Sequence, residues 1–416
     1  MAQMTKTLDR PESGYARLVA RAAFACCIVA LVSGLIPQAE MALLGGNVII
    51  GNALAKGLLL VCLLIISFLN PKLKIDEPFI VWWFLLVLFL VFEIGFLSLA
   101  SDIPLWNVLG AYNGDYLLPL IGVPFFLFGG NISEKATIRV ITLIFLVCVM
   151  ISLAQYLTNE PLLYTESADG NFIVSSWDFA GSTRAFSLFS SPLEYGIFCS
   201  FCGALGVALS KYRRMSGLLL LAASGFACYT TLTRLCYLLF ACACVYALVL
   251  TFGKKPRRGL WQPALFFVLG IATIFAGLNS LAQGNPSGLQ DVSSLLDRIE
   301  EWTYGYQLLS QASLSHQLFG MGITQNAKFT DMPMLIDNAP LALSLHIGLI
   351  GLILFTIYFV SVWLYLRREA IAKQQPFIIA AASLWSTLLC AGTFNIIFSS
   401  FGAVFVLAVL CRTERK

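Results

Sequence analysis

The chain has 416 residues, of which 59% are hydrophobic and only 12% are charged, whereas soluble globular proteins carry about 25% charged residues. This composition excludes a soluble globular fold for most of the chain. The formal net charge of +4 is small. Because the basic residues lie in short polar segments between apolar runs, membrane orientation explains them better than a nucleic-acid partner does.

Long apolar runs recur along the chain, and each can cross the hydrocarbon core of a bilayer, about 30 Å thick, as a helix. We therefore predict an all-helical, polytopic membrane protein that forms one transmembrane domain over residues 1–416. The predicted spans, about twelve in number, are 18–36, 48–69, 79–99, 116–130, 139–157, 192–210, 215–232, 235–252, 261–281, 340–366, 377–393 and 395–411.

The basic residues predict the orientation of these spans. With both termini in the cytoplasm, most of the 26 Lys and Arg residues fall in cytoplasmic segments, as the positive-inside rule requires. The exceptions are Lys56, Arg184, Arg234, Arg298 and Lys328, which lie within a span or on the outer face. A cation in or beside the membrane is unfavourable and usually marks a site, so these residues are where we look for function.

Two long loops are predicted on the outer face, at residues 158–191 and 282–338. Within the second loop, residues 291–310 have helical periodicity. The apolar side of this helix would consist of Leu295, Ile299, Trp302 and Leu309. This pattern predicts an amphipathic helix that lies over the outer surface.

No nucleotide-binding or zinc-protease motif is present, and the sequence contains only two histidines, His316 and His346. We therefore expect chemistry that uses arginines, carboxylates and amides at the outer face, without a metal or another cofactor. Substrates that reach such a site from within the bilayer are lipids.

Arginine offers planar, paired donors that match phosphate oxygens. Arg184 precedes the sixth span, Arg234 lies at the tight turn between the seventh and eighth spans, and Arg298 lies in the amphipathic helix. If they converge, these three side chains would bind a diphosphate. The alternatives are a loop-anchoring ion pair for Arg184, an interfacial snorkelling role for Arg234 and a surface ion pair for Arg298. Lys56, in the outer half of the second span, would either snorkel or contact a lipid phosphate.

Asp337 and Asn338 immediately precede the tenth span. Asp337 would cap that helix, or act as a general base that takes a proton from an acceptor hydroxyl, or do both. His316 is a second candidate base, although a loop histidine is more often simply solvated. His346, inside the tenth span, is expected to bond a neighbouring helix, and Glu93 in the third span is a candidate ion partner.

The outer residues also form an ordered set of short motifs. An arginine lies ahead of an aromatic-rich span start (Arg184, Phe186), and a Thr-Arg pair lies at an outer turn (Thr233, Arg234). A basic residue lies in a loop helix ahead of a G-x-G turn (Arg298, Trp302, Gly320, Gly322), and a polar residue and Asn precede an apolar run with two glycines (Asp337, Asn338, Gly348, Gly351). In this order the chain, from about Thr183 to Leu366, resembles the bacterial O-antigen ligase and polymerase family. Ligases of this family typically have His where this chain has Asp337, a difference that favours a polymerase.

The resemblance implies a GT-C-like fold in the bacterial inner membrane, with the active site facing the periplasm. It implies a metal-independent glycosyltransferase that acts on undecaprenyl-diphosphate-linked glycans among the membrane lipids, with a chain-length regulator and a flippase as partners. Arg184, Arg234, Arg298 and Lys56 would bind the diphosphate, and Asp337 would be the base. Asn338, Trp302 and His316 would position the acceptor.

A polymerase would transfer the glycan chain to a lipid-linked repeat unit, and a ligase would transfer it to a lipid A core or a protein. A flippase or transporter for the lipid-linked oligosaccharide is the alternative from another class. A flippase is expected to place cations at several depths of the membrane, whereas the predicted spans of this chain concentrate their polarity at one end.

Overall fold

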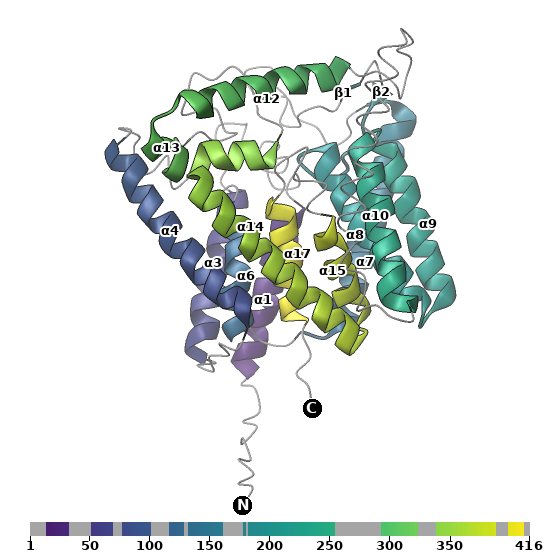
Figure 1. Ribbon diagram of the computed structural model, residues 1–416. Coiled ribbons are helices and arrows are strands. Elements are labelled where there is room, and N and C mark those ends of the chain that lie inside the picture. Colours follow the sequence, from purple (N-terminus) through teal and green to yellow (C-terminus); the bar gives the residue numbers. More distant parts are fainter. Residues whose placement is uncertain are drawn as a thin grey trace, which may run out of the picture.

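The computed structural model describes residues 14–32, 51–69, 77–100, 116–128, 132–160, 178–179, 182–253, 293–322, 338–387 and 398–411. Within these ranges the fold is helical, apart from one antiparallel pair of two-residue strands, β1 (Asp178–Phe179) and β2 (Ser182–Thr183). Most of the helices stand side by side as a bundle, and a smaller group lies across one end of it (Figure 1).

The helices of the described residues have the following bounds: α1 Gly14–Leu31, α3 Gly51–Leu69, α4 Pro78–Ala100, α6 Leu117–Phe128, α7 Glu134–Thr158, α8 Pro192–Ser210, α9 Arg214–Thr230, α10 Arg234–Phe252, α12 Ser293–Gln311, α13 Leu314–Phe319, α14 Ala339–Lys373, α15 Pro376–Ser386 and α17 Phe398–Leu410. Proline lies in the first turn of α8, α14 and α15. Its fixed φ suits a helix start, and the amide that it lacks would be unpaired there.

Five of the described helices are long and apolar enough to cross a membrane: α4 (over Pro78–Leu99), α7, α8, α10 and α14. The prediction of a helical membrane protein is confirmed at this level. The count of about twelve spans and their orientation stay predictions, and the span predicted at 261–281 lies outside the described residues.

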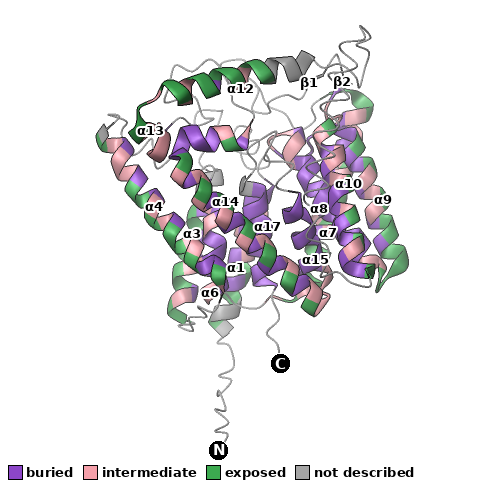
Figure 2. Cartoon of the chain, viewed as in Figure 1, coloured by how far each residue is buried: buried purple, intermediate pink, exposed green. Residues whose placement is uncertain are grey.

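The sides of several helices expose large apolar residues. Examples are Leu64 on α3, Leu88 on α4, Leu143 on α7 and Leu219 on α9, each more than half exposed. Figure 2 shows exposed residues along the outer sides of α3, α4 and α9, while buried residues face inward. Contiguous apolar surface of this extent is unfavourable in water and suits contact with lipid chains.

Several helix ends meet at one end of the bundle, which we call the basal end. Lys211 Nζ donates to Gln374 Oε1 (2.9 Å), and Gln374 Nε2 donates to the carbonyl of Leu250 (3.3 Å). The amide of Phe377 donates to Glu134 Oε1 (3.0 Å). The starts of α7, α9 and α15 and the ends of α8, α10 and α14 therefore share the basal end.

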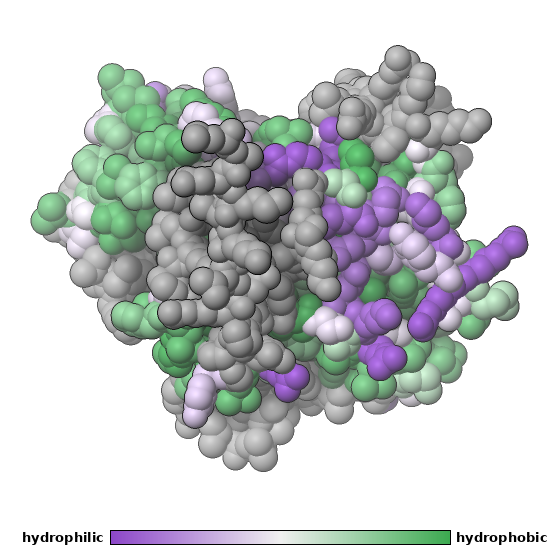
Figure 3. All heavy atoms as spheres, turned by 90° about the horizontal axis from the view of Figure 1, so that it is seen from below, coloured by the Kyte–Doolittle hydropathy of each residue, from purple (hydrophilic) through white to green (hydrophobic). Residues whose placement is uncertain are grey.

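Many of the cations that the sequence assigns to the cytoplasm lie near these contacts. They are Lys135, Arg139, Lys211, Arg213, Arg214, Arg367, Arg368 and Lys373. Viewed from this end, hydrophilic residues gather over one part of the surface, with hydrophobic residues around them (Figure 3). The basal end is thus a charged face, and its location in the cytoplasm stays a prediction.

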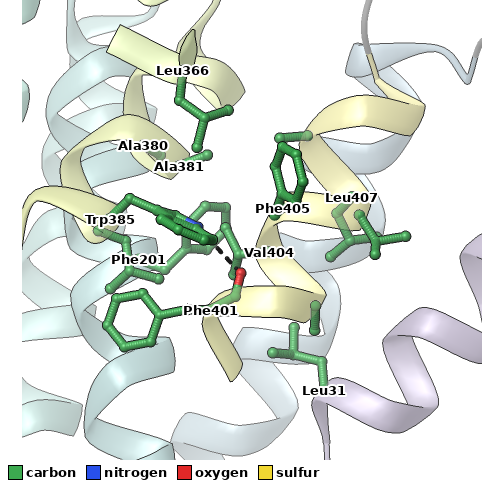
Figure 4. Packing of buried hydrophobic residues seen from close by; sticks show 14 of the residues in the cluster. Leu31, Phe201, Leu366, Ala380, Ala381, Trp385, Phe401, Val404, Phe405 and Leu407 are labelled. Carbon is green, nitrogen blue, oxygen red and sulfur yellow. Dashed lines mark hydrogen bonds between the residues drawn. The ribbon is translucent and has the colours of Figure 1, made fainter. Parts of the chain in front are cut away.

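The centre of the bundle is packed with aromatic and small residues around Trp385 of α15 (Figure 4). The Trp385 ring stacks on Phe359 of α14, with centroids 4.8 Å apart, and contacts Phe405 of α17 at 5.8 Å. Its Nε1 donates to the carbonyl of Phe401 (3.2 Å). The polar end of the indole is therefore satisfied inside the core, as a buried tryptophan requires.

At the opposite end, which we call the apical end, α14 is broken at Gly348, where φ is +69°. The first segment, up to Ile347, lies across the end of the bundle beneath α12, and the second segment runs down to Lys373 (Figure 1). The span predicted over 340–366 lies within α14, but the sequence did not indicate the break at Gly348. Hydropathy does not report a break in a helix that stays apolar on both sides.

The backbone around the break is paired with the segment that follows α13. The amide of Met321 donates to the carbonyl of Leu345 (2.8 Å), and the amide of Gly322 donates to the carbonyl of His346 (3.2 Å). A side chain at Gly348 would collide with the carbonyl of Leu318. We call this contact between 318–322 and 345–348 the glycine clasp. It satisfies carbonyl groups that the broken helix leaves unpaired.

Candidate functional site

The segment that carries Arg184 is held at the apical end by the last turns of α7. Gln155 Oε1 accepts hydrogen bonds from the amides of Phe186 (3.1 Å) and Ser187 (2.9 Å). The hydroxyl of Ser187 donates to the carbonyl of Cys148 (2.9 Å). Phe186 and Ser187 are fully buried, whereas Arg184 is half-buried. The backbone next to Arg184 is thus fixed, and the side chain stands at the edge of the packed region.

The same segment is bonded to the turn between α9 and α10. The amide of Ala185 donates to the carbonyl of Thr230, at the end of α9 (3.0 Å). The turn contains Leu232 with φ of +47°, an uncommon conformation for a residue with a side chain and one often found at functional sites. Arg234 begins α10 directly after this turn and is exposed.

The structure therefore brings Arg184 and Arg234 to one place. The N-cap residue Thr233 makes no side-chain bond to the first turn of α10, because its hydroxyl donates to the carbonyl of Thr231 (2.9 Å). Arg184 and the start of α10, whose first residue is Arg234, therefore lie in one region, where their charges and the positive end of the helix dipole favour an anion.

The predicted amphipathic helix is present as α12, and it lies across the apical end (Figure 1). Trp302 and Leu309 contact the first segment of α14 at Ala342 and Leu345, as the predicted apolar side requires. Ile299, also expected on that side, is 37% exposed. The contact is centred further along the helix, and Gly305, between Trp302 and Leu309, is buried. Arg298 belongs to α12, and its side chain lies outside the described residues.

Asn338 is the N-cap of α14, and its Oδ1 accepts a hydrogen bond from the amide of Leu341 (3.1 Å). The sequence interpretation considered Asp337 for this cap, and that assignment is wrong. The helix begins at Ala339, so the cap position falls one residue later in the chain. Asp337 itself lies outside the described residues, and its role as a base stays a prediction.

Lys56 and His316 lie in other parts of the molecule. Lys56 is only 6% exposed on α3, which packs against α1 and α6. His316 lies within α13, where its Nδ1 is 2.7 Å from the hydroxyl of Ser313, and its ring packs on Phe96 of α4. Both α3 and α13 are on the opposite side of the bundle from α9 and α10 (Figure 1). The structure thus does not bring Lys56 or His316 to the two arginines.

His346 bonds a neighbouring element, as expected: its Nδ1 lies 2.8 Å from the hydroxyl of Tyr116, directly before α6. Gln155, in contrast, was missed by sequence reasoning, although a polar residue on an otherwise apolar helix near the outer end was a usable signal. A cluster of tyrosines beside Arg234 was also missed. Tyr229 packs against Tyr156 (6.1 Å between centroids) and Tyr237 (6.5 Å).

Comparison with known proteins does not assign this chain to a family. No protein-family model matches the chain, and no curated protein matches it either.

Proposed function

We propose that the chain is a membrane glycosyltransferase that transfers an undecaprenyl-diphosphate-linked glycan chain onto a lipid-linked repeat unit at the apical end. The apical end would face the periplasm of a bacterial inner membrane. The observation that carries the proposal is the hydrogen bond between Ala185 and Thr230, which joins the backbone beside Arg184 to the turn that leads into Arg234.

Paired arginines at an outer membrane surface suit a diphosphate. The guanidinium group presents a planar fork of donors that matches phosphate oxygens and stays charged at every physiological pH. The uncapped start of α10 adds partial positive charge at the same place. The tight hold of Gln155 on the Arg184 segment supports a preorganised site, since its two amide contacts leave the backbone little freedom.

The proposed reaction forms one bond and breaks one. The acceptor hydroxyl oxygen attacks the anomeric carbon of the donor sugar, and the bond from that carbon to the diphosphate oxygen breaks. Negative charge grows on the leaving undecaprenyl diphosphate, and Arg184 and Arg234 stabilise it. Asp337 takes the proton from the acceptor hydroxyl. Arg298 and Trp302, carried by α12, would cover the site and hold the acceptor.

The experiment uses purified full-length protein in liposomes with diphosphate-linked repeat units. We expect the wild type to lengthen them, and we expect Arg234→Ala to lower the rate by about 100-fold or more, the usual effect of removing one donor to a developing anion. Arg214→Ala is the matched control, because Arg214 is an exposed arginine at the basal start of α9. Full activity of Arg234→Ala would refute the proposed role of this residue.

The acceptor that the protein requires distinguishes a polymerase from a ligase. If product forms only after a lipid A core is added, the protein is a ligase and not a polymerase. If the lipid-linked oligosaccharide crosses the liposome membrane and is not lengthened, the protein is a flippase and not a transferase.

A further inference from the structure

Glu93 is a fully buried acid in the apical half of α4. Its side chain has an exposed fraction of 0%, and neither carboxyl oxygen has a hydrogen-bond partner among the described residues. α4 is one of the helices long and apolar enough to cross a membrane. Glu93 precedes the end of α4 by seven residues, which places it about 10 Å from that end.

Among the described residues, the neighbours of Glu93 on α4 are apolar. It lies on the same buried side of α4 as Leu90 and Leu97. Phe89 and Phe96, one turn away in either direction, pack against Phe319 of α13. The sequence made Glu93 a candidate ion partner, but among the described residues no salt bridge to it is present. An ionised carboxylate without a partner in such a place is strongly unfavourable.

A polar pair lies at the same height in the bundle. α4 and α14 run in opposite directions, and Phe89 of α4 lies against Gly351 of α14, with a Phe89 ring carbon 2.8 Å from the place of a Cβ. Glu93 lies one helical turn beyond Phe89 towards the apical end, and Ile347 lies one turn beyond Gly351 in the same direction. Glu93 is therefore level with Ile347, beside the break in α14. The Tyr116–His346 hydrogen bond (2.8 Å) lies at this break.

Three unusual features thus lie at one level of the bundle among the described residues: an acid without a hydrogen-bond partner, a buried tyrosine–histidine pair and an interrupted membrane helix. Ionisable groups inside membrane helices are usually functional, and breaks in such helices frequently accompany ion or proton sites. Among the described residues, the elements that contact α4 near this level carry the titratable groups His346 (α14), Tyr116 (before α6) and His316 (α13).

We propose that Glu93 is a proton-binding site in the membrane interior and that it exchanges its proton through the Tyr116–His346 pair. The bound form is the neutral carboxylic acid. On release the proton passes to the hydroxyl and imidazole groups of the pair, and the carboxylate then accepts a hydrogen bond from Tyr116. The site is independent of the proposed transferase chemistry, which is assigned to the arginines on the other side of the bundle.

Infrared spectroscopy of the full-length protein in liposomes at pH 7 tests the protonation state. A neutral carboxylic acid has a carbonyl band that a carboxylate lacks, and solvated Asp and Glu side chains are almost entirely ionised at this pH. We expect the band in the wild type and its loss in Glu93→Gln. The matched control is Glu369→Gln: Glu369 is paired with Lys373 (2.8 Å), so its replacement should remove carboxylate bands and keep the neutral-acid band.

The absence of a neutral-acid band in the wild type would overturn the proposal without any variant. A band that persists in folded Glu93→Gln would overturn the assignment to this residue. If Glu93→Gln does not fold, Glu93→Asp keeps the acid and should shift the band, and an unshifted band in that variant has the same overturning effect.

Exchange of the acid proton for deuterium tests the pathway. On transfer to heavy water, the neutral-acid band shifts as Glu93 exchanges. We expect Tyr116→Phe, which keeps the ring and removes the hydroxyl, to slow this shift by about tenfold or more. An unchanged rate in Tyr116→Phe would show that protons reach Glu93 by another route and would refute this part of the proposal.

Discussion

Replacing Gly348 by alanine tests how firmly the apical helices are held to the membrane domain. Gly348 has a φ of +69°, and a Cβ there would lie 2.5 Å from the amide nitrogen of Gly320 and collide with the carbonyl of Leu318. The colliding atoms belong to backbone, so they cannot move aside by a change of rotamer. The variant therefore has to open the glycine clasp.

The expected loss of stability follows from two effects. Gly348 has φ of +69° and ψ of 179°, a conformation that is essentially restricted to glycine, so a residue with a Cβ is destabilised there by about 1–3 kcal/mol. Opening the clasp also removes the bonds from Met321 to Leu345 and from Gly322 to His346, and each polar group left buried without a partner is unfavourable by about 1–3 kcal/mol. We expect a total destabilisation of about 3–9 kcal/mol for this region.

The measurement combines thermal unfolding in detergent with amide hydrogen exchange of residues 314–322. Gly57→Ala is the control, because Gly57 lies within α3 and has no atom within 4 Å of an added Cβ. That variant should be neutral or more stable by up to about 1 kcal/mol. If Gly348→Ala unfolds like the wild type and Met321 and Gly322 keep their exchange protection, the clasp does not hold the apical helices.

Two further substitutions test the positions of site residues. Gln155→Leu leaves two buried amides beside Arg184 without an acceptor, so we expect a loss of about 2–4 kcal/mol in the free energy of unfolding. Gln155→Glu keeps the acceptor oxygens and should lose less, and equal losses in both variants would contradict this account. Asn338→Ala removes the N-cap of α14 and should destabilise it by about 1 kcal/mol, whereas Asn338→Asp should retain the cap. If the unfolding curves of the two Asn338 variants coincide, the cap bond to Leu341 contributes nothing to stability.

The predictable part of the fold is the part that depends on local sequence. Apolar runs and the periodicity of 291–310 located α12 and most ends of the described helices to within about five residues, but α14 ends seven residues later and α15 seven residues earlier than predicted. Thr233 and Arg234 were correctly placed at a tight turn between two helices, because the polar TLTR segment interrupts the apolar run.

The rest depends on contacts between distant segments. Nothing local to Gln155 indicates that its side chain binds amides more than thirty residues later. The break in α14 arises because Gly348 meets the backbone of Leu318, and the sequence displays only a glycine in an apolar run. The grouping of Lys56 with Arg184 and Arg234 failed for a related reason: hydropathy gives the depth of a residue in the membrane, and it does not give the helix neighbours.

The glycine clasp also bears on how the chain assembles during synthesis. Met321 and Gly322 donate the amides of the clasp. The ribosome synthesises them shortly before Leu345 and His346, whose carbonyls accept these hydrogen bonds. Contacts between segments close in sequence form early and need little loop closure. The break in α14 can thus be set while this helix enters the bilayer, before α15 and α17 are made. The C-terminal helices would then pack against an apical half that already has its final shape.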